Sequence, residues 1–178
     1  ALHDIGTGET AVLTSGANVT VMAMSGDWLL WSTGGSSLIA RRLSTGETTE
    51  LPILYDVPCF DVSGDWAVIR SLAFAVPDGR IVAHNLLTHE ELPVDGILLP
   101  TVPQGVFNCP AVNGSLVAYT RRPAIDDITP FGELTSFPYY RDFLAANPPT
   151  QILFEDMTAA RNIDVSSTRL VWEDDRDG

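Results

Sequence analysis

A short internal repeat constrains the fold of this chain more than any single residue does. In the repeat, a turn of small residues leads into an apolar strand, as in VSGDWAVI at 62–69. The same pattern occurs at 24–31 and at 112–119, and a worn copy occupies 165–172. A unit that returns along a chain is the signature of a repeat architecture. The sequence therefore predicts a fold assembled from copies of one unit.

A second marker alternates with the first. A turn of the Thr-Gly-Glu type lies between two extended pieces at 6–9 and 44–47, and Leu-Thr-His-Glu takes its place at 87–90. We assign the small-residue turn to the join of strands one and two, and the Thr-Gly-Glu turn to the join of strands three and four. Successive small-residue turns are 38, 50 and 53 residues apart. Four short strands in about 40 residues are typical of one β-propeller blade, so the longer spacings need insertions.

We therefore expect an all-β chain, a β-propeller built of four-stranded antiparallel blades, with about four blades in the single domain 1–178. One such sheet cannot bury both of its faces, so neighbouring sheets have to stack. The chain is 45% hydrophobic and 19% charged, which suits a folded domain with a real core. Core packing between blades is the expected role of Trp28, Trp31, Trp66 and Trp172.

Residues 121–149 break the repeat and are interpreted as an insertion within the third blade. Within them, 136–147 predicts one short helix, because Ser136 is a plausible N-cap and Pro138 would lie in the first turn. Pro148 would then follow the end of the helix. This would be the one helix of an otherwise all-β chain.

Four side chains of that segment are candidates for partner binding. Aromatic residues and arginine are enriched at binding hot spots, and the segment supplies Tyr139, Tyr140, Arg141 and Phe143. We expect these four to contact a protein partner. The alternative is that Phe143 and Leu144 merely clamp the helix to the propeller.

The repeat units resemble a known family. Ser-Gly-Asp-Trp before a strand at 25–28 and 63–66, Thr-Gly-Glu before another strand, and the ending LVWEDDRDG at 170–178 are similar to TolB-like, PD40-like β-propeller repeats of bacteria and archaea. The resemblance covers most of the chain but fails over 121–149. Proteins of this kind are mostly binding and scaffold proteins of the cell envelope or secreted proteins. The resemblance therefore implies an extracytoplasmic location, whether periplasmic, cell-surface or secreted, and it carries over no catalytic residue.

The two cysteines occupy the same position in adjacent units. Cys59 lies four residues before Ser63, and Cys109 lies four residues before Asn113. Equivalent positions on neighbouring innermost strands approach each other near the propeller axis. In a chain that resembles exported proteins, two such thiols predict a disulfide between Cys59 and Cys109. The alternative is a pair of buried free thiols.

Motifs for catalysis and metal binding are absent from the sequence. The histidines show no His-x-x-x-His spacing, no Cys-x-x-Cys occurs, and no Gly-x-Ser-x-Gly nucleophile elbow is found. Residues 174–178 resemble the acidic start of a calcium loop, but Arg176 and the missing distal glutamate favour an exposed hairpin turn. We therefore expect no catalytic residue, no metal site and no cofactor, with calcium as a weak alternative.

The charge of the chain bears on its partners. A formal net charge of −13 repels nucleic acid and anionic membrane surfaces. No run of 18 apolar residues occurs, so no membrane insertion is expected. A protein partner, or self-association, is the remaining expectation.

Two functions fit these observations. The first is a non-catalytic extracytoplasmic propeller that acts as a binding or structural scaffold through protein–protein contacts. The second is a secreted or envelope enzyme that acts on carbohydrate or peptide through carboxylates at the propeller channel. On the predicted innermost strands only Asp61 and Asp164 are acidic. A lining this apolar favours the scaffold.

The two chain ends each carry half of a unit. Residues 1–13 match strands three and four, and 162–172 match strands one and two. Pairing of these halves inside one chain would close a four-bladed propeller, which we favour slightly. Pairing between chains would give a polymer by strand exchange. The third alternative is a segment of a longer propeller with six to eight blades.

Overall fold

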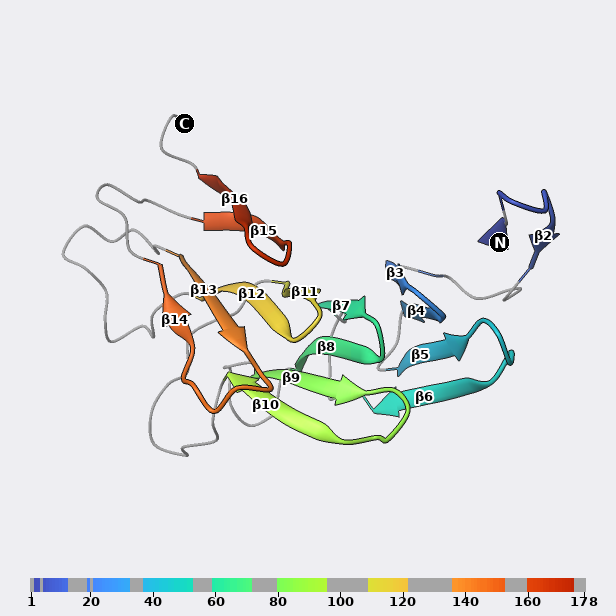
Figure 1. The fold of residues 1–178 in the computed structure, drawn as a ribbon, viewed down its shortest axis with the longest axis horizontal. Coiled ribbons are helices and arrows are strands. Elements are labelled where there is room, and N and C mark those ends of the chain that lie inside the picture. The colour runs from blue at the N-terminus through green and yellow to red at the C-terminus, as the bar shows by residue number, and fades with distance from the viewer. Residues whose placement is uncertain are drawn as a thin grey trace.

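The structure is a computed structural model of the chain. It describes residues 2–3, 5–12, 19, 21–32, 37–52, 59–71, 80–95, 109–121, 136–152 and 160–174. These residues form three four-stranded sheets and two two-stranded sheets, and every strand pair is antiparallel (Figure 1). Within each four-stranded sheet the strands follow one another in chain order. The predicted all-β class and the four-stranded antiparallel unit are confirmed.

We call the three complete sheets blades one, two and three. Blade one consists of β3 (Val21–Ser25), β4 (Trp28–Ser32), β5 (Ser37–Arg42) and β6 (Thr48–Pro52). Blade two consists of β7 (Cys59–Ser63), β8 (Trp66–Ser71), β9 (Arg80–Asn85) and β10 (Glu91–Asp95). Blade three consists of β11 (Ala111–Asn113), β12 (Leu116–Arg121), β13 (Phe137–Asp142) and β14 (Thr150–Gln151).

Each end of the chain carries a two-stranded sheet. The N-terminal half-blade is the hairpin of β1 (Leu2–His3) and β2 (Thr10–Ala11). The C-terminal half-blade is the hairpin of β15 (Ala160–Val165) and β16 (Leu170–Asp174).

The helix predicted over 136–147 is wrong. Residues 137–142 form β13, which pairs with all six residues of β12, from Leu116 opposite Asp142 to Arg121 opposite Phe137. Aromatic residues favour strands, and a residue before proline is biased toward extended backbone. Pairing with β12 then outweighs the local helix signals. No helix occurs in the described part of the chain, and thus none that could span a membrane.

This correction also changes the interpretation of 121–149. Residues 137–142 and 150–151 are the third and fourth strands of blade three, so they belong to the regular blade. Residues 122–135 lie outside the described residues.

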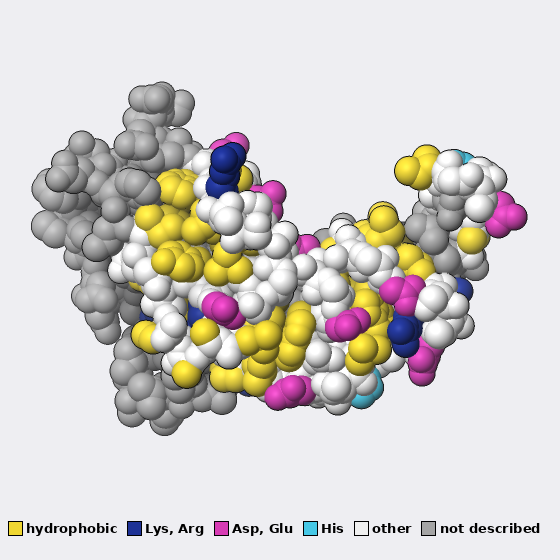
Figure 2. Space-filling model, viewed as in Figure 1, with side chains coloured by type: hydrophobic (Ala, Val, Ile, Leu, Met, Phe, Trp, Pro, Cys, Tyr) yellow, Lys and Arg dark blue, Asp and Glu magenta, His cyan; other side chains and the backbone are white. Residues whose placement is uncertain are grey.

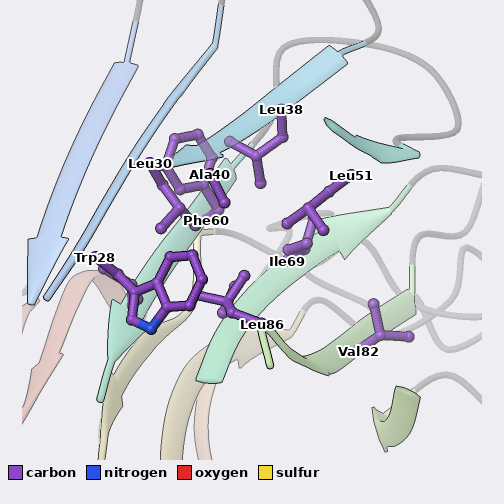
Figure 3. Packing of buried hydrophobic residues seen from close by; sticks show 11 residues of the cluster. Trp28, Leu30, Leu38, Ala40, Leu51, Phe60, Ile69, Val82 and Leu86 are labelled. Atoms are coloured by element: carbon purple, nitrogen blue, oxygen red, sulfur yellow. The ribbon is translucent and has the colours of Figure 1, made fainter. Parts of the chain in front are cut away.

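The core consists of apolar layers between neighbouring blades. In the first layer, Trp28 and Leu30 of blade one meet Phe60 and Ile69 of blade two, with exposed fractions between 0% and 7% (Figure 3). A second layer lies between blades two and three, and a third between blade three and the C-terminal half-blade. Each complete blade thus buries the face that meets its neighbour, as radial stacking requires.

Closure inside one chain, the alternative favoured from the sequence, is wrong for this structure. The half-blades are separate two-stranded sheets, and Figure 1 places them at opposite ends of an arc of blades. The outline of the molecule is concave between these two ends (Figure 2). Within the described residues, β1–β2 and β15–β16 therefore do not pair with each other.

Candidate functional site

Polar contacts between neighbouring blades use the same positions in successive units. The carboxylate of Asp61 accepts the N–H of Val62 at 2.8 Å and, from the next blade, the N–H of Val112 at 2.9 Å. The hydroxyl of Ser63 accepts the N–H of Gly114 at 2.8 Å. One blade earlier, Ser25 accepts the N–H of Gly64 at 3.2 Å. These bonds fix the offset between the innermost strands of adjacent blades.

Asp27 and Asp65 hold the small-residue turns against other parts of the structure. The indole N–H of Trp28 donates to Asp65 at 2.9 Å, which links blade one to blade two. Asp27 accepts the Arg42 Nε–H at 2.9 Å and the N–H of Ser44 at 2.7 Å, so it joins the two hairpins of blade one. A hydrogen bond from the Ser44 hydroxyl and the Arg42 guanidinium hold the pKa of Asp27 below its usual value.

The disulfide predicted from the repeat positions is present. Cys59 of β7 and Cys109, two residues before β11, are bonded, with their Cα atoms 4.9 Å apart. The bond fastens the innermost strand of blade two to that of blade three. It acts beside the hydrogen bond from Val112 to Asp61.

The four residues predicted to bind a partner lie on and just after β13. Phe143 is 5% exposed and meets Trp66 edge to face, with ring centroids 5.0 Å apart. Arg141 donates through Nη1 to the carbonyl of Pro93 at 3.1 Å. These side chains hold blade three against blade two, which is the clamping alternative for Phe143.

The two tyrosines differ in their surroundings. Tyr139 stacks on Tyr119 with ring centroids 5.7 Å apart, and Tyr119 is buried and donates to Asp95 at 2.7 Å. Burial, and then the Asp95 carboxylate, raise the pKa of Tyr119 well above its usual value. Tyr140 is half-buried. The structure thus brings Tyr139, Arg141 and Phe143 together as an internal contact between blades.

The outer face of blade one is exposed at β3 but covered at β4, where Trp31 and Leu29, the cross-strand partners of Met22 and Met24, are only 5% and 8% exposed. Met22 and Met24 of β3 are 66% and 60% exposed. Phe60 and Val62 occupy the equivalent positions of β7, where the preceding blade covers them, and they are only 7% and 5% exposed. Two large apolar side chains of blade one are therefore exposed at positions that are buried in blade two.

The C-terminal half-blade has an exposed apolar position on its opposite face, the one that a complete blade turns toward the blade that follows it. Val171 of β16 is 61% exposed, whereas the equivalent Leu30 and Val68 are fully buried against the blade that follows theirs. At the N-terminal half-blade Ile5 is 95% exposed, whereas the equivalent Leu86 is 4% exposed. We call Met22 and Met24 the leading face, and Val171 with the outer edge of β16 the trailing face.

The histidines and the acidic segment 174–178 were the candidates for metal binding in the sequence. Within the described ranges, no three or more His, Cys, Asp or Glu side chains are grouped so that they could hold a metal ion. Residues 175–178 of the calcium candidate lie outside the described residues. His84 lies 3.5 Å from Glu91, measured from Nδ1 to Oε1. Acidic side chains are scattered over the visible face in Figure 2.

Comparison with known proteins decides the fold. No protein-family model and no curated protein sequence matches the chain. The crystal structure of TolB from Acinetobacter baumannii matches with a TM-score of 0.56 and 12% identity, over 96% of this chain and 44% of the TolB chain. The fold is that of a TolB-like β-propeller. The computationally designed Ika4 protein matches with a TM-score of 0.59 and 12% identity, over 93% of this chain and 90% of its own. The chain therefore spans less than half the length of the TolB chain that it matches.

The leading and trailing faces of this TolB-like propeller were missed from the sequence. Aligning the units would have placed Met22 and Met24 with Phe60 and Val62, which are both apolar inward positions. The alignment could not tell whether a blade covers them. That follows from the arrangement of the sheets in space.

Proposed function

We propose that this TolB-like propeller is a non-catalytic scaffold that acts outside the cytoplasm by binding protein through its leading and trailing faces. One observation carries the proposal. Met22, Met24 and Val171 are each at least 60% exposed, at positions that the complete blades bury. Exposed apolar side chains that lie together on a folded domain, as Met22 and Met24 do on β3, mark interaction surfaces.

The disulfide supports a location outside the cytoplasm. Disulfides persist in oxidising compartments and are rare in the reducing cytosol. The Cys59–Cys109 bond links two blades and has no thiol partner to exchange with, because the chain has only two cysteines. A structural role in an oxidising compartment fits this arrangement, and the TolB-like fold points the same way.

The environment of Asp61 favours a scaffold over a channel enzyme. Its two carboxylate oxygens accept the backbone N–H groups of Val62 and Val112 at 2.8 and 2.9 Å. A carboxylate engaged in this way joins two blades. The second acidic side chain of the innermost strands, Asp164, likewise accepts the N–H of Val165 at 2.7 Å.

Photo-crosslinking in the native cells tests the proposal. A photoreactive amino acid at position 22 or 171 should form adducts with protein, and one at position 87 should not. Leu87 is a matched control, because it is 47% exposed but lies in the turn between β9 and β10. Protein adducts no more frequent at positions 22 and 171 than at position 87 would refute binding through these faces.

A further inference from the structure

We propose that Asn113 is a site of spontaneous deamidation, and that the hydrogen bond from the N–H of Gly114 to the hydroxyl of Ser63 limits its rate. The product is isoaspartate or aspartate in the turn between β11 and β12. This covalent change involves neither the leading nor the trailing face, and it goes beyond the proposed function. The sequence of the turn, the freedom of its side chain and its contacts with blade two all point to it.

The sequence directs the reaction to one asparagine. Asn113 precedes Gly114, whereas every other asparagine of the chain precedes a larger residue or proline. Deamidation begins when the backbone nitrogen of the next residue attacks the side-chain carbonyl carbon of asparagine. Glycine allows this attack best, because it has no Cβ to crowd the ring that forms and because its backbone rotates most freely.

The turn leaves the side chain of Asn113 unrestrained. Asn113 ends β11 and pairs with Leu116, so Gly114 and Ser115 form a two-residue loop. Gly114 has a φ of 60°, as the first loop residue of a type II′ hairpin does. Asn113 is exposed, and its amide forms no hydrogen bond with the described part of the chain. The amide can therefore rotate until its carbonyl carbon approaches the nitrogen of Gly114.

Two other asparagines show the opposite situation. The Oδ1 atom of Asn85 accepts the N–H of Leu87 at 3.0 Å and that of Thr88 at 2.9 Å. The side-chain amide of Asn162 donates to Glu173. Both side chains are thus held in place, and both asparagines precede a bulky residue. They serve as internal controls in the same molecule.

A hydrogen bond between blades holds the attacking nitrogen. The N–H of Gly114 donates to the hydroxyl of Ser63 in blade two at 2.8 Å. The nitrogen becomes a nucleophile only when it loses this proton, and its lone pair must then turn toward the side chain of Asn113. Both events require the bond to Ser63 to open. Removal of one such neutral hydrogen bond raises the population of the open state about fivefold.

The reaction needs water and no other reagent. The nitrogen of Gly114 forms a bond to Cγ of Asn113 and loses its proton, while the bond from Cγ to Nδ2 breaks and ammonia leaves. Water then opens the resulting succinimide ring at one of its two carbonyl groups. Cleavage of the bond from Cγ to the nitrogen of Gly114 gives aspartate. Cleavage of the bond from the main-chain carbonyl carbon to that nitrogen gives isoaspartate, in which the main chain passes through Cβ and Cγ.

Isoaspartate would disturb the contacts on both sides of position 113. The N–H of Val112 donates to Asp61 at 2.9 Å, and the N–H of Gly114 donates to Ser63 at 2.8 Å, so both acceptors belong to blade two. Isoaspartate lengthens the main chain between these two donors by one methylene group. The donors then no longer match the spacing of their acceptors, and blade three is held less firmly against blade two. Aspartate keeps the normal main chain and adds only a negative charge.

Peptide mapping of the full chain after prolonged incubation in mildly alkaline buffer tests the site. Base speeds the reaction because it removes the proton from the nitrogen of Gly114. Mass spectrometry should detect conversion at Asn113, with Asn85 and Asn162 intact, and an isoaspartate-specific methyltransferase should label the converted peptide. Conversion at Asn113 no faster than at Asn85 would overturn the proposal.

Variants of two equivalent serines test the hydrogen bond. Ser63→Ala should raise the rate at Asn113 about fivefold, because the N–H of Gly114 loses its acceptor. Ser25→Ala is the matched control. It removes the equivalent bond to the N–H of Gly64, 3.2 Å long, and should leave the rate at Asn113 unchanged. Equal rates in these two variants would overturn the role of Ser63.

Two further measurements separate this effect from a general loosening of the fold. Ser63→Thr keeps a hydroxyl and should deamidate at the wild-type rate, so a rate as high as that of Ser63→Ala would also count against the proposal. The isoaspartate fraction of aged protein, separated by ion exchange, should unfold at a lower urea concentration than the Asn113→Asp variant, which carries the same charge on a normal main chain. Equal midpoints would overturn the predicted disturbance of the contacts with blade two.

Discussion

Replacing Cys59 and Cys109 with alanine should lower the free energy of unfolding by about 4 kcal/mol. The bond joins positions 50 apart in the chain and closes the whole of blade two into a loop. In the chain-entropy description, a cross-link over a loop of that length removes about 4 kcal/mol of conformational freedom from the unfolded chain. For a domain of this size the loss corresponds to a fall in melting temperature of about 8–16 °C.

Urea unfolding of the oxidised wild type and of the alanine variant, followed by tryptophan fluorescence, measures this difference. Reducing the wild type with a phosphine should reproduce the loss, and the same phosphine should not affect the alanine variant. A loss below about 1 kcal/mol would refute the reasoning, because the loop-closure term would then be missing. A loss on substitution that reduction does not reproduce would point to side-chain packing instead.

Two further predictions concern polar groups between blades. Asp61→Asn should destabilise the fold by about 1–3 kcal/mol in urea unfolding. The reason is that the amide N–H₂ group would face a backbone N–H, either that of Val62 or that of Val112. An unchanged midpoint of urea unfolding would contradict the bridge between blades. Tyr119→Phe should remove part of the loss of stability at alkaline pH. The pKa of Tyr119 is raised in the folded state by burial and then by the Asp95 carboxylate. The contribution of Tyr119 to the free energy of unfolding is therefore present below about pH 10 and falls as the pH rises above it. If the free energy of unfolding falls equally in the two proteins from pH 8 to 11, measured in steps of ~1 unit, that assignment is contradicted.

The repeat predicted most of the fold because each blade carries its own turn residues. Gly46 has a φ of 75°, which suits glycine, and the equivalent His89 adopts a φ of 61° in the same kind of turn. Thus even a turn without glycine keeps the blade register, because its threonine and glutamate remain. The helix at 136–147 failed for the opposite reason. Its local signals were typical of a helix, but six paired residues of β12 stabilise the strand.

The candidate site was less predictable than the fold. The disulfide followed from repeat position alone, since equivalent residues on adjacent innermost strands lie close together. Phe143 and Arg141, two of the four residues predicted to bind a partner, contact blade two of the same chain, and partner binding by the four stays a prediction. Which apolar face is covered depends on how many blades surround it, and Met22 reads in sequence as another buried position.

The position of the disulfide also determines how the chain would bear mechanical tension. A force applied between the two ends of the protein would pass directly from Cys59 to Cys109 and would bypass the 50-residue span between them. Unravelling the rest of the chain would therefore leave roughly 170 Å of contour length unreleased. Blade two would not be extended for as long as the disulfide is intact. Reduction of the disulfide would make that contour length available for extension.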